Sequence, residues 1–130
     1  MKFLLDTHYA IKLVDRHAGG MHEPDVLEKV QEQGELAISV ASLWEVAIKS
    51  RLGKLPLLLN AAKWPSMLAA LEIPLLRITH GHVLAEIGPL LGTNDPFDRL
   101  LLGICVAEDM RLVTADRALI GHQFAWRQFP

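Results

Sequence analysis

Four carboxylates occupy places where a layered α/β protein gathers its catalytic groups. Asp6, Glu45 and Asp116 each come shortly after a short apolar run that predicts a strand. Asp98 stands at the head of an apolar run that predicts a buried helix. Because ligands of open parallel sheets collect beyond the carboxyl ends of the strands, we expect these four side chains to meet at one edge of a sheet.

Such a cluster of carboxylates predicts a bound cation. Two carboxylates ~4 Å apart repel each other by roughly 4 kcal/mol at an effective dielectric constant near 20. Either some of them are protonated or a metal ion compensates the charge. A set of oxygen ligands without Cys or His suits Mg²⁺, with Mn²⁺ as an alternative, and such ions activate water for phosphodiester hydrolysis. No Ser or Cys has a partner base that would indicate a covalent route.

Three of the acidic residues also have a plainer structural interpretation. Asp6 could simply cap the helix that follows it. Glu45 could form a capping box with Ser42, or an i,i+4 ion pair with Lys49. Asp95 is placed to cap the helix that carries Asp98, and we interpret it as a cap rather than as a site residue.

Length and composition favour one folded domain over residues 1–130. The chain is 51% hydrophobic and 22% charged, which argues against disorder. Its formal net charge of −2 gives no overall basic field for nucleic acid, so a polyanion would need a local basic patch. The one cysteine, Cys105, lies in an apolar run and predicts a buried, unreactive thiol. No membrane span or signal peptide is evident, and we expect a cytoplasmic protein.

Strands and helices alternate along the chain. This order favours an α/β fold with a mainly parallel central sheet. We expect strands at 2–5, 36–40, 73–78, 110–114 and 124–129. We expect helices at 8–15, 24–33, 42–52, 61–72 and 79–90, and a further helix from Pro96 through Ala107.

Basic and histidine residues supply candidate phosphate or metal contacts. Lys49, Arg51 and Lys54 form a small basic cluster that is either a solvated helix face or a phosphate contact. His80 and His82 are two positions apart, so they do not share a helix face. We interpret both as surface residues rather than as metal ligands.

Four stretches of the chain, in this order and spacing, resemble the PIN-domain ribonucleases, and most closely the VapC-type toxins of bacterial toxin–antitoxin pairs. They cover nearly the whole chain, and together they are far more specific than any one alone. The stretches are Phe3 to His8, Ser42 to Leu55, Asp95 to Leu101 and Leu112 to Asp116.

The resemblance implies a three-layer α/β/α PIN-like fold and a Mg²⁺-dependent endoribonuclease. It also implies a homodimer that a VapB-type antitoxin, encoded beside it, neutralises. The family's catalytic acidic positions correspond here to Asp6, Glu45, Asp98 and Asp116. Asp6 and Asp98 match the positions most often assigned to the metal, and we expect Asp116 to be a further ligand.

Three further residues are candidate RNA contacts. Thr114 matches a small polar residue that lies beside the site in the family. Arg99 follows Asp98 and is able to pair with a carboxylate or to contact a phosphate. Lys49 belongs to the basic cluster, and recognition of single-stranded RNA needs phosphate contacts as well as stacking on bases.

Two other functions fit parts of this pattern. A PIN-like module that binds RNA or a protein without cleavage would keep the fold and lose the chemistry. A phosphatase of the haloacid-dehalogenase type would use Asp6 as a nucleophile after a strand. That type also needs a second Asp two residues on, where this chain has His8.

Overall fold

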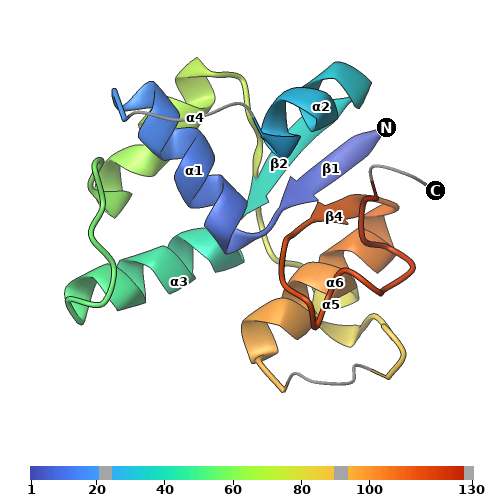
Figure 1. Cartoon of the computed structure of the whole chain (residues 1–130). Coiled ribbons are helices and arrows are strands. Elements are labelled where there is room, and N and C mark those ends of the chain that lie inside the picture. The colour runs from blue at the N-terminus through green and yellow to red at the C-terminus, as the bar shows by residue number, and fades with distance from the viewer. Residues whose placement is uncertain (21–24, 90–93, 128–130) are drawn as a thin grey trace.

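A central parallel sheet organises the chain, which we describe from a computed structural model that defines residues 1–20, 25–89 and 94–127 (Figure 1). Its four strands are β1 (Lys2–Leu5), β2 (Glu35–Ser39), β3 (Leu75–Leu76) and β4 (Arg111–Val113). They lie in the order β3-β2-β1-β4, and every pairing is parallel. The carboxyl ends of all four strands therefore point towards the same edge of the sheet.

Helices connect the strands and close the two faces of the sheet. The pairing of β1 with both β2 and β4 puts the N-terminal strand at the centre. The helices are α1 (Thr7–His17), α2 (Val26–Gln33), α3 (Val40–Arg51), the 3-10 helix η1 (Ala61–Lys63), α4 (Trp64–Ala70), α5 (His80–Leu84) and α6 (Pro96–Glu108).

Alternating side chains of the strands build two separate cores. Phe3 and Leu5 pack with α1, α2 and α4 on one face, whereas Leu4 packs with α6 on the other. Val113 and Leu112 divide between the two cores in the same way. Figure 1 shows the blue, cyan and green helices on one side of the sheet and the yellow and orange helices on the other. The predicted three-layer α/β/α fold with a parallel sheet is confirmed.

Two predicted strands are much shorter than expected. The strand predicted at 73–78 is reduced to β3, which begins after Pro74 because proline cannot donate to a ladder. The strand predicted at 124–129 makes one isolated bridge, Leu112 to Ala125, within the described residues, and residues 128–130 lie outside them. Both segments lie at the edges of the sheet, where short pairing is common.

Helix α3 begins earlier than predicted. Ser39, not Ser42, caps it, and its Oγ accepts a hydrogen bond from the backbone N of Ala41 at 2.9 Å. Ser42 is buried inside the helix, so the predicted capping box with Glu45 is wrong. Glu45 consequently lies in the second turn of α3, where its carboxylate is free for tertiary contacts.

His82 is buried, which corrects its interpretation as a surface residue. Its side chain is 3% exposed and its Nδ1 accepts a hydrogen bond from the backbone N of Thr79. Its Nε2 lies 2.7 Å from Oε1 of Glu108 on α6. The helix predicted at 79–90 ends already at Leu84, because the chain turns extended at Ala85. The predicted end at Leu90 and the predicted helix start at Pro24 lie outside the described residues.

The single cysteine matches its prediction. Cys105 is fully buried in α6, and burial raises the pKa of its thiol to about 12. The side chain therefore packs as a small apolar residue and is not a nucleophile. None of the helices in the described ranges combines the length and apolar character that crossing a bilayer requires.

Gly103 allows α5 to approach α6 closely, and a substitution there tests this packing. A Cβ at this position would collide with the backbone oxygen of His82. We expect Gly103→Ala to lower the free energy of unfolding by about 1–3 kcal/mol, the usual cost of overpacking. Gly81→Ala on α5 is the matched control, since its Cβ would meet only Thr79 Oγ1 at 3.7 Å. Equal urea unfolding curves for the two variants would contradict the packing argument.

Candidate acidic active site

A pocket of about 480 Å³ opens at the carboxyl ends of β1 and β4. Residues of helices α1, α3 and α6 line it, and all four of the carboxylates predicted from the sequence are in its lining. Figure 1 shows the arrangement of these three helices around the ends of the strands. Its polar lining comes from Asp6, Thr7, His8, Glu45, Lys49, Asp95, Asp98 and Asp116. The parallel sheet thus brings together acidic residues that are spread over most of the chain.

Asp6 is buried at the end of the central strand and also caps α1. Its Oδ1 accepts a hydrogen bond from the backbone N of Tyr9 at 2.9 Å, and only 8% of the residue is exposed. Burial raises the pKa of this carboxyl, while hydrogen bonds from Thr114 and Tyr9 and the charge of His8 act in the opposite direction. The nearby charge of Asp116 adds to the rise. Capping and a place in the pocket are therefore compatible.

Glu45 has both carboxylate oxygens engaged. Thr7 Oγ1 donates to Oε1 at 2.6 Å, and Lys49 Nζ lies 2.6 Å from Oε2. The i,i+4 pair between Glu45 and Lys49 is thus confirmed. The hydrogen bond to Glu45 is the main cause of a raised pKa of Lys49, and the charges of Asp95 and Asp98 add to it. The ammonium group therefore lies within the field of three acidic side chains, Glu45, Asp95 and Asp98.

The first turn of α6 supplies two carboxylates. Asp95 caps the helix, since its Oδ1 accepts a hydrogen bond from the backbone N of Phe97 at 2.8 Å, and the predicted cap is confirmed. Asp95 also lines the pocket, so the same residue both caps the helix and belongs to the site, whereas we interpreted it as a cap alone. Asp98 lies in the first turn of the helix, near the positive end of the helix dipole.

The turn after β4 supplies the last carboxylate. The backbone N of Asp116 donates to Thr114 Oγ1 at 3.1 Å, and Asp116 Oδ1 accepts from the backbone N of Ala118 at 2.9 Å. These bonds hold Asp116, which is exposed, in the lining of the pocket. Arg99 is exposed and is not among the residues that line the pocket, so its predicted RNA contact would lie outside it.

Thr7 and Ser42 belong to the site, although the sequence interpretation did not include them. Thr7 Oγ1 lies 3.1 Å from Ser42 Oγ in addition to its bond with Glu45. The available signal was the place of Thr7, a polar residue directly after the same strand end as Asp6. Ser42 carried no such signal, because its contact depends on how α3 packs against α1.

The donor set fits a hard divalent cation, although the side chains do not form a finished coordination shell. No group of three or more His, Cys, Asp or Glu within the described ranges is arranged to hold one metal ion. Mg²⁺ commonly uses only one or two carboxylates and keeps several waters. Asp6 and Asp98 on the pocket wall satisfy this smaller requirement with oxygen ligands alone. The raised pKa of Asp6 marks a carboxylate whose charged form a cation would stabilise.

The PIN domain family model matches residues 3–123, which span every strand and all the acidic residues of the pocket. The chain belongs to the PIN domain family. Proteins of this family are generally metal-dependent nucleases. The resemblance seen in the sequence motifs is therefore confirmed at family level, and the phosphatase alternative gains no support.

A solved structure shows the same PIN fold. The chain is similar to a protein chain in the crystal structure of VapBC2 from Rickettsia felis bound to a DNA fragment from their promoter. The TM-score is 0.60 at 18% sequence identity, over 98% of this chain and 100% of that chain. No curated protein matches the sequence significantly.

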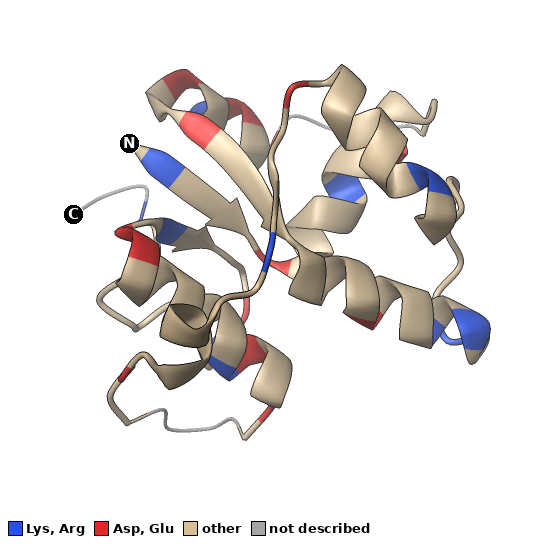
Figure 2. Ribbon diagram, turned by 180° about the vertical axis from the view of Figure 1, so that it is seen from behind, with Lys and Arg blue, Asp and Glu red and all other residues tan. Residues whose placement is uncertain are grey.

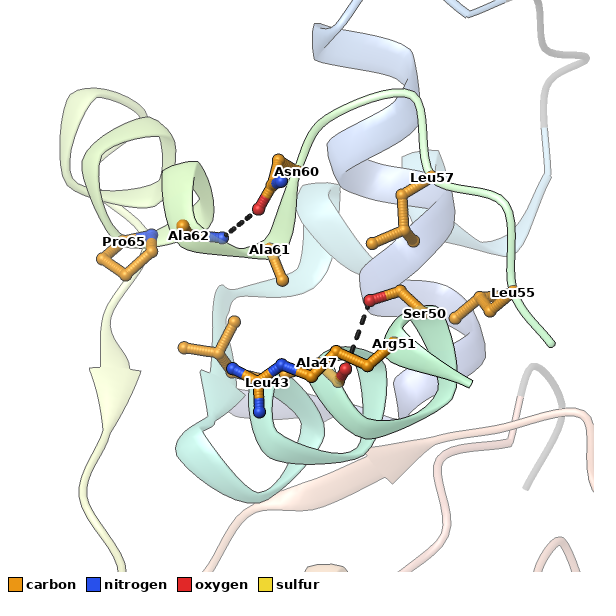
Figure 3. A pocket seen from close by; sticks show the side chains of 10 residues that line it. All are labelled: Leu43, Ala47, Ser50, Arg51, Leu55, Leu57, Asn60, Ala61, Ala62 and Pro65. Atoms are coloured by element: carbon orange, nitrogen blue, oxygen red, sulfur yellow. Dashed lines mark hydrogen bonds between the residues drawn. The ribbon is translucent and has the colours of Figure 1, made fainter. Parts of the chain in front are cut away.

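A second, more apolar hollow lies beside the acidic pocket of this PIN domain. This groove of about 630 Å³ runs between α3, the following loop and η1 (Figure 3). Two local bonds shape its walls, from Ser50 Oγ to the backbone O of Ala47 and from the backbone N of Ala62 to Asn60 Oδ1. Its lining residues are Leu43, Ala47, Ser50, Arg51, Leu55, Leu57, Asn60, Ala61, Ala62 and Pro65.

Replacing Asp6 tests the electrostatics of this PIN-domain pocket. Burial raises the pKa of Asp6, so its ionisation opposes folding once the pH is above that raised value. We expect metal-free Asp6→Asn to melt at a higher temperature than the wild type at pH 7. The difference should shrink as the pH falls below the raised pKa and vanish below the ordinary Asp value of ~3.9, where the wild-type carboxyl becomes neutral in both states.

The effect of Mg²⁺ on the melting temperature is the complementary measurement. Mg²⁺ should raise the melting temperature of the wild type and have a smaller effect on Asp6→Asn, because a ligand stabilises only the state that binds it. Asp109→Asn is the matched control, since Asp109 is an exposed residue at the far end of α6. A wild type that melts higher than Asp6→Asn in metal-free buffer at pH 7 would contradict the proposed cost of the buried charge.

Proposed function

We propose that this PIN domain is the toxin of a VapC-type toxin–antitoxin pair and a Mg²⁺-dependent endoribonuclease. The observation that carries the proposal is the convergence of Asp6, Glu45, Asp98 and Asp116 on one pocket at the carboxyl edge of the sheet. Acidic residues gathered in this way suit a divalent cation and the hydrolysis of a phosphodiester bond. Membership of a family of metal-dependent nucleases supports the same chemistry.

The residues divide the work according to their environments. Asp6, Asp98 and Asp116 are the proposed metal ligands, and a bound Mg²⁺ would offset negative charge on the phosphate and its leaving oxygen. Glu45 is held by Thr7 and Lys49 and lines the pocket, where it would orient the attacking water.

Thr114 and Lys49 contribute in different ways. Thr114 fixes Asp6 and the backbone of Asp116, so we propose that it shapes the metal site and borders the substrate. The ammonium of Lys49 is able to exchange part of its contact with Glu45 for a phosphate oxygen of the RNA. Arg99, exposed outside the pocket, is a proposed contact for a more distant phosphate.

The proposed partners follow from the same family resemblance. We propose a cytoplasmic homodimer that a VapB-type antitoxin, encoded beside it, inhibits. The groove of Figure 3 is the surface proposed for the antitoxin, because it is largely apolar and lies next to the acidic pocket. Arg51 in its wall and the nearby Lys54 and Lys63 favour a segment that combines apolar and acidic side chains. Figure 2 shows basic residues as blue ribbon at the carboxyl end of α3.

Cleavage of total cellular RNA is the direct test of the proposed activity. We expect the purified chain, freed of antitoxin, to give discrete RNA fragments in Mg²⁺ and none after addition of EDTA. Asp98→Asn should lower the rate by more than about a hundredfold, since even outer partners of metal ligands cost that much in other sites. Asp109→Asn on the same helix should cleave like the wild type, because Asp109 is exposed and outside the pocket.

The main alternative is a PIN-like module that binds RNA or protein without cleaving. Folded wild-type protein that binds Mg²⁺ and cuts no RNA would favour that alternative. Equal cleavage by Asp98→Asn and the wild type would remove the acidic pocket as the site of hydrolysis. Mapping the ends of the fragments would identify the RNA.

A pair of matched substitutions tests the groove. Ala62 is exposed within the groove, whereas Ala69 is exposed on α4 outside it. We expect Ala62→Arg to weaken binding of the antitoxin at least tenfold, because the long side chain fills apolar volume that the partner would occupy. Ala69→Arg should bind normally in the same calorimetric titration. Equal affinities for both variants would place the antitoxin elsewhere.

A further inference from the structure

Trp44 on α3 is exposed in a way that the other tryptophans are not. It is 59% exposed, whereas Trp64 is fully buried and Trp126 is half-buried. The indole N–H of Trp64 donates to the backbone O of Leu59, and that of Trp126 donates to Gln33 Oε1. Among the described residues, the indole N–H of Trp44 has no such acceptor. Single exposed apolar side chains are common on protein surfaces, so the significance of Trp44 depends on what its ring contacts and where it lies.

Phe97 fixes the orientation of this exposed ring. The two ring centroids lie 5.5 Å apart with an angle of 60° between the planes, which is an edge-to-face contact. Phe97 belongs to the first turn of α6, which Asp95 and Pro96 hold in place. The pair therefore joins two helices and keeps the indole of Trp44 from rotating freely.

The aromatic pair is adjacent in sequence to residues that line the acidic pocket. Trp44 directly precedes Glu45 on α3, and Phe97 stands between Asp95 and Asp98 on α6. The three acidic residues all line the pocket, whereas neither ring is part of its lining. The contact between Trp44 and Phe97 thus bridges the two helices that form adjacent walls of the candidate active site.

The charge of the pocket explains why an aromatic surface is useful there. A carboxylate-lined pocket repels phosphates wherever metal does not compensate it, and Lys49 is already paired with Glu45. Stacking between a base and an aromatic ring does not depend on charge, and it accepts any base because each has a π face. Proteins that bind single-stranded RNA use this contact routinely.

We infer that Trp44, braced by Phe97, is a stacking platform for a nucleobase of single-stranded RNA next to the phosphate that is cut. The inference rests on the proposed ribonuclease activity and adds a positioning residue to it. Trp44 would hold the strand beside the pocket while the carboxylates act on the neighbouring phosphate. The edge-to-face contact leaves the exposed part of the indole available to a base.

Binding to RNA tests the platform without requiring cleavage. The probes are a single-stranded oligoribonucleotide and an abasic ribose-phosphate chain of equal length, in Ca²⁺ in place of Mg²⁺. We expect Trp44→Ala to weaken binding of the oligoribonucleotide about tenfold to a hundredfold and to leave the abasic chain unaffected. Trp44→Phe should retain most of the affinity. Leu52→Ala is the control, since Leu52 is also an exposed apolar residue at the end of α3.

Tryptophan fluorescence reports the contact directly. The oligoribonucleotide should quench the wild-type emission and should leave the emission of Trp44→Phe nearly unchanged, because Trp64 is buried and Trp126 is bonded to Gln33. In the cleavage assay, Trp44→Ala should raise KM and change kcat little, since the carboxylates are untouched.

The outcomes separate this inference from the proposed function. If the wild type cleaves RNA and Trp44→Ala has the same RNA affinity and the same KM, the platform is overturned and the nuclease remains. If the wild type does not cleave RNA but its RNA binding depends on Trp44, the platform is supported and the nuclease is overturned. The wild type could form a dimer that Trp44→Ala does not form, with the wild-type indole protected from quenching by acrylamide. This result would show that the ring packs against a second copy of the chain, and it would overturn the inference.

Discussion

Burying the carboxylate of Asp6 at the end of the central strand is the constraint on which the candidate site depends. Its charged form loses hydration there, and a backbone N–H from Tyr9 and the hydroxyl of Thr114 replace part of it. Strand β1 is held on both sides by β2 and β4, so the carboxylate cannot move outward without disturbing the sheet. The packed sheet therefore holds the Asp6 carboxylate in a buried position that is unfavourable for its charged form.

Glu45 is as deeply buried as Asp6, yet its charge is compensated within the protein. Thr7 and Lys49 each bind one of its oxygens, and α3 brings the lysine to it by i,i+4 spacing. The pocket thus contains one carboxylate, Glu45, in an ion pair with a lysine, and another, Asp6, for which the described part of the chain shows no ion pair with Lys or Arg. This difference favours Asp6 for an exchangeable metal and Glu45 for a positioning role, which the family resemblance alone would not distinguish.

Sequence reasoning located the strands, the order of the layers and the acidic residues because each depends on local signals. The apolar runs before Asp6 and Asp116 predicted strands that end at a carboxylate, and the sequence also predicted Asp95 as a helix cap. The errors concern features that packing decides. The cap of α3 moved to Ser39 because β2 ends there, and His82 is buried because Gly103 lets α5 approach α6. Thr7 and Trp44 acquire their significance only from helices that are distant in sequence.

Helix α3 links the acidic pocket to the apolar groove through different faces of one element. Glu45 and Lys49 face the pocket, whereas Leu43 and Ala47 face the groove. Leu55, in the loop after α3, lines both hollows, so they are neighbours rather than separate sites. A partner segment that fills the groove reaches the wall of the pocket at Leu55. Under the proposed function, an antitoxin seated in the groove would therefore restrict access of RNA without having to contact the metal ligands themselves.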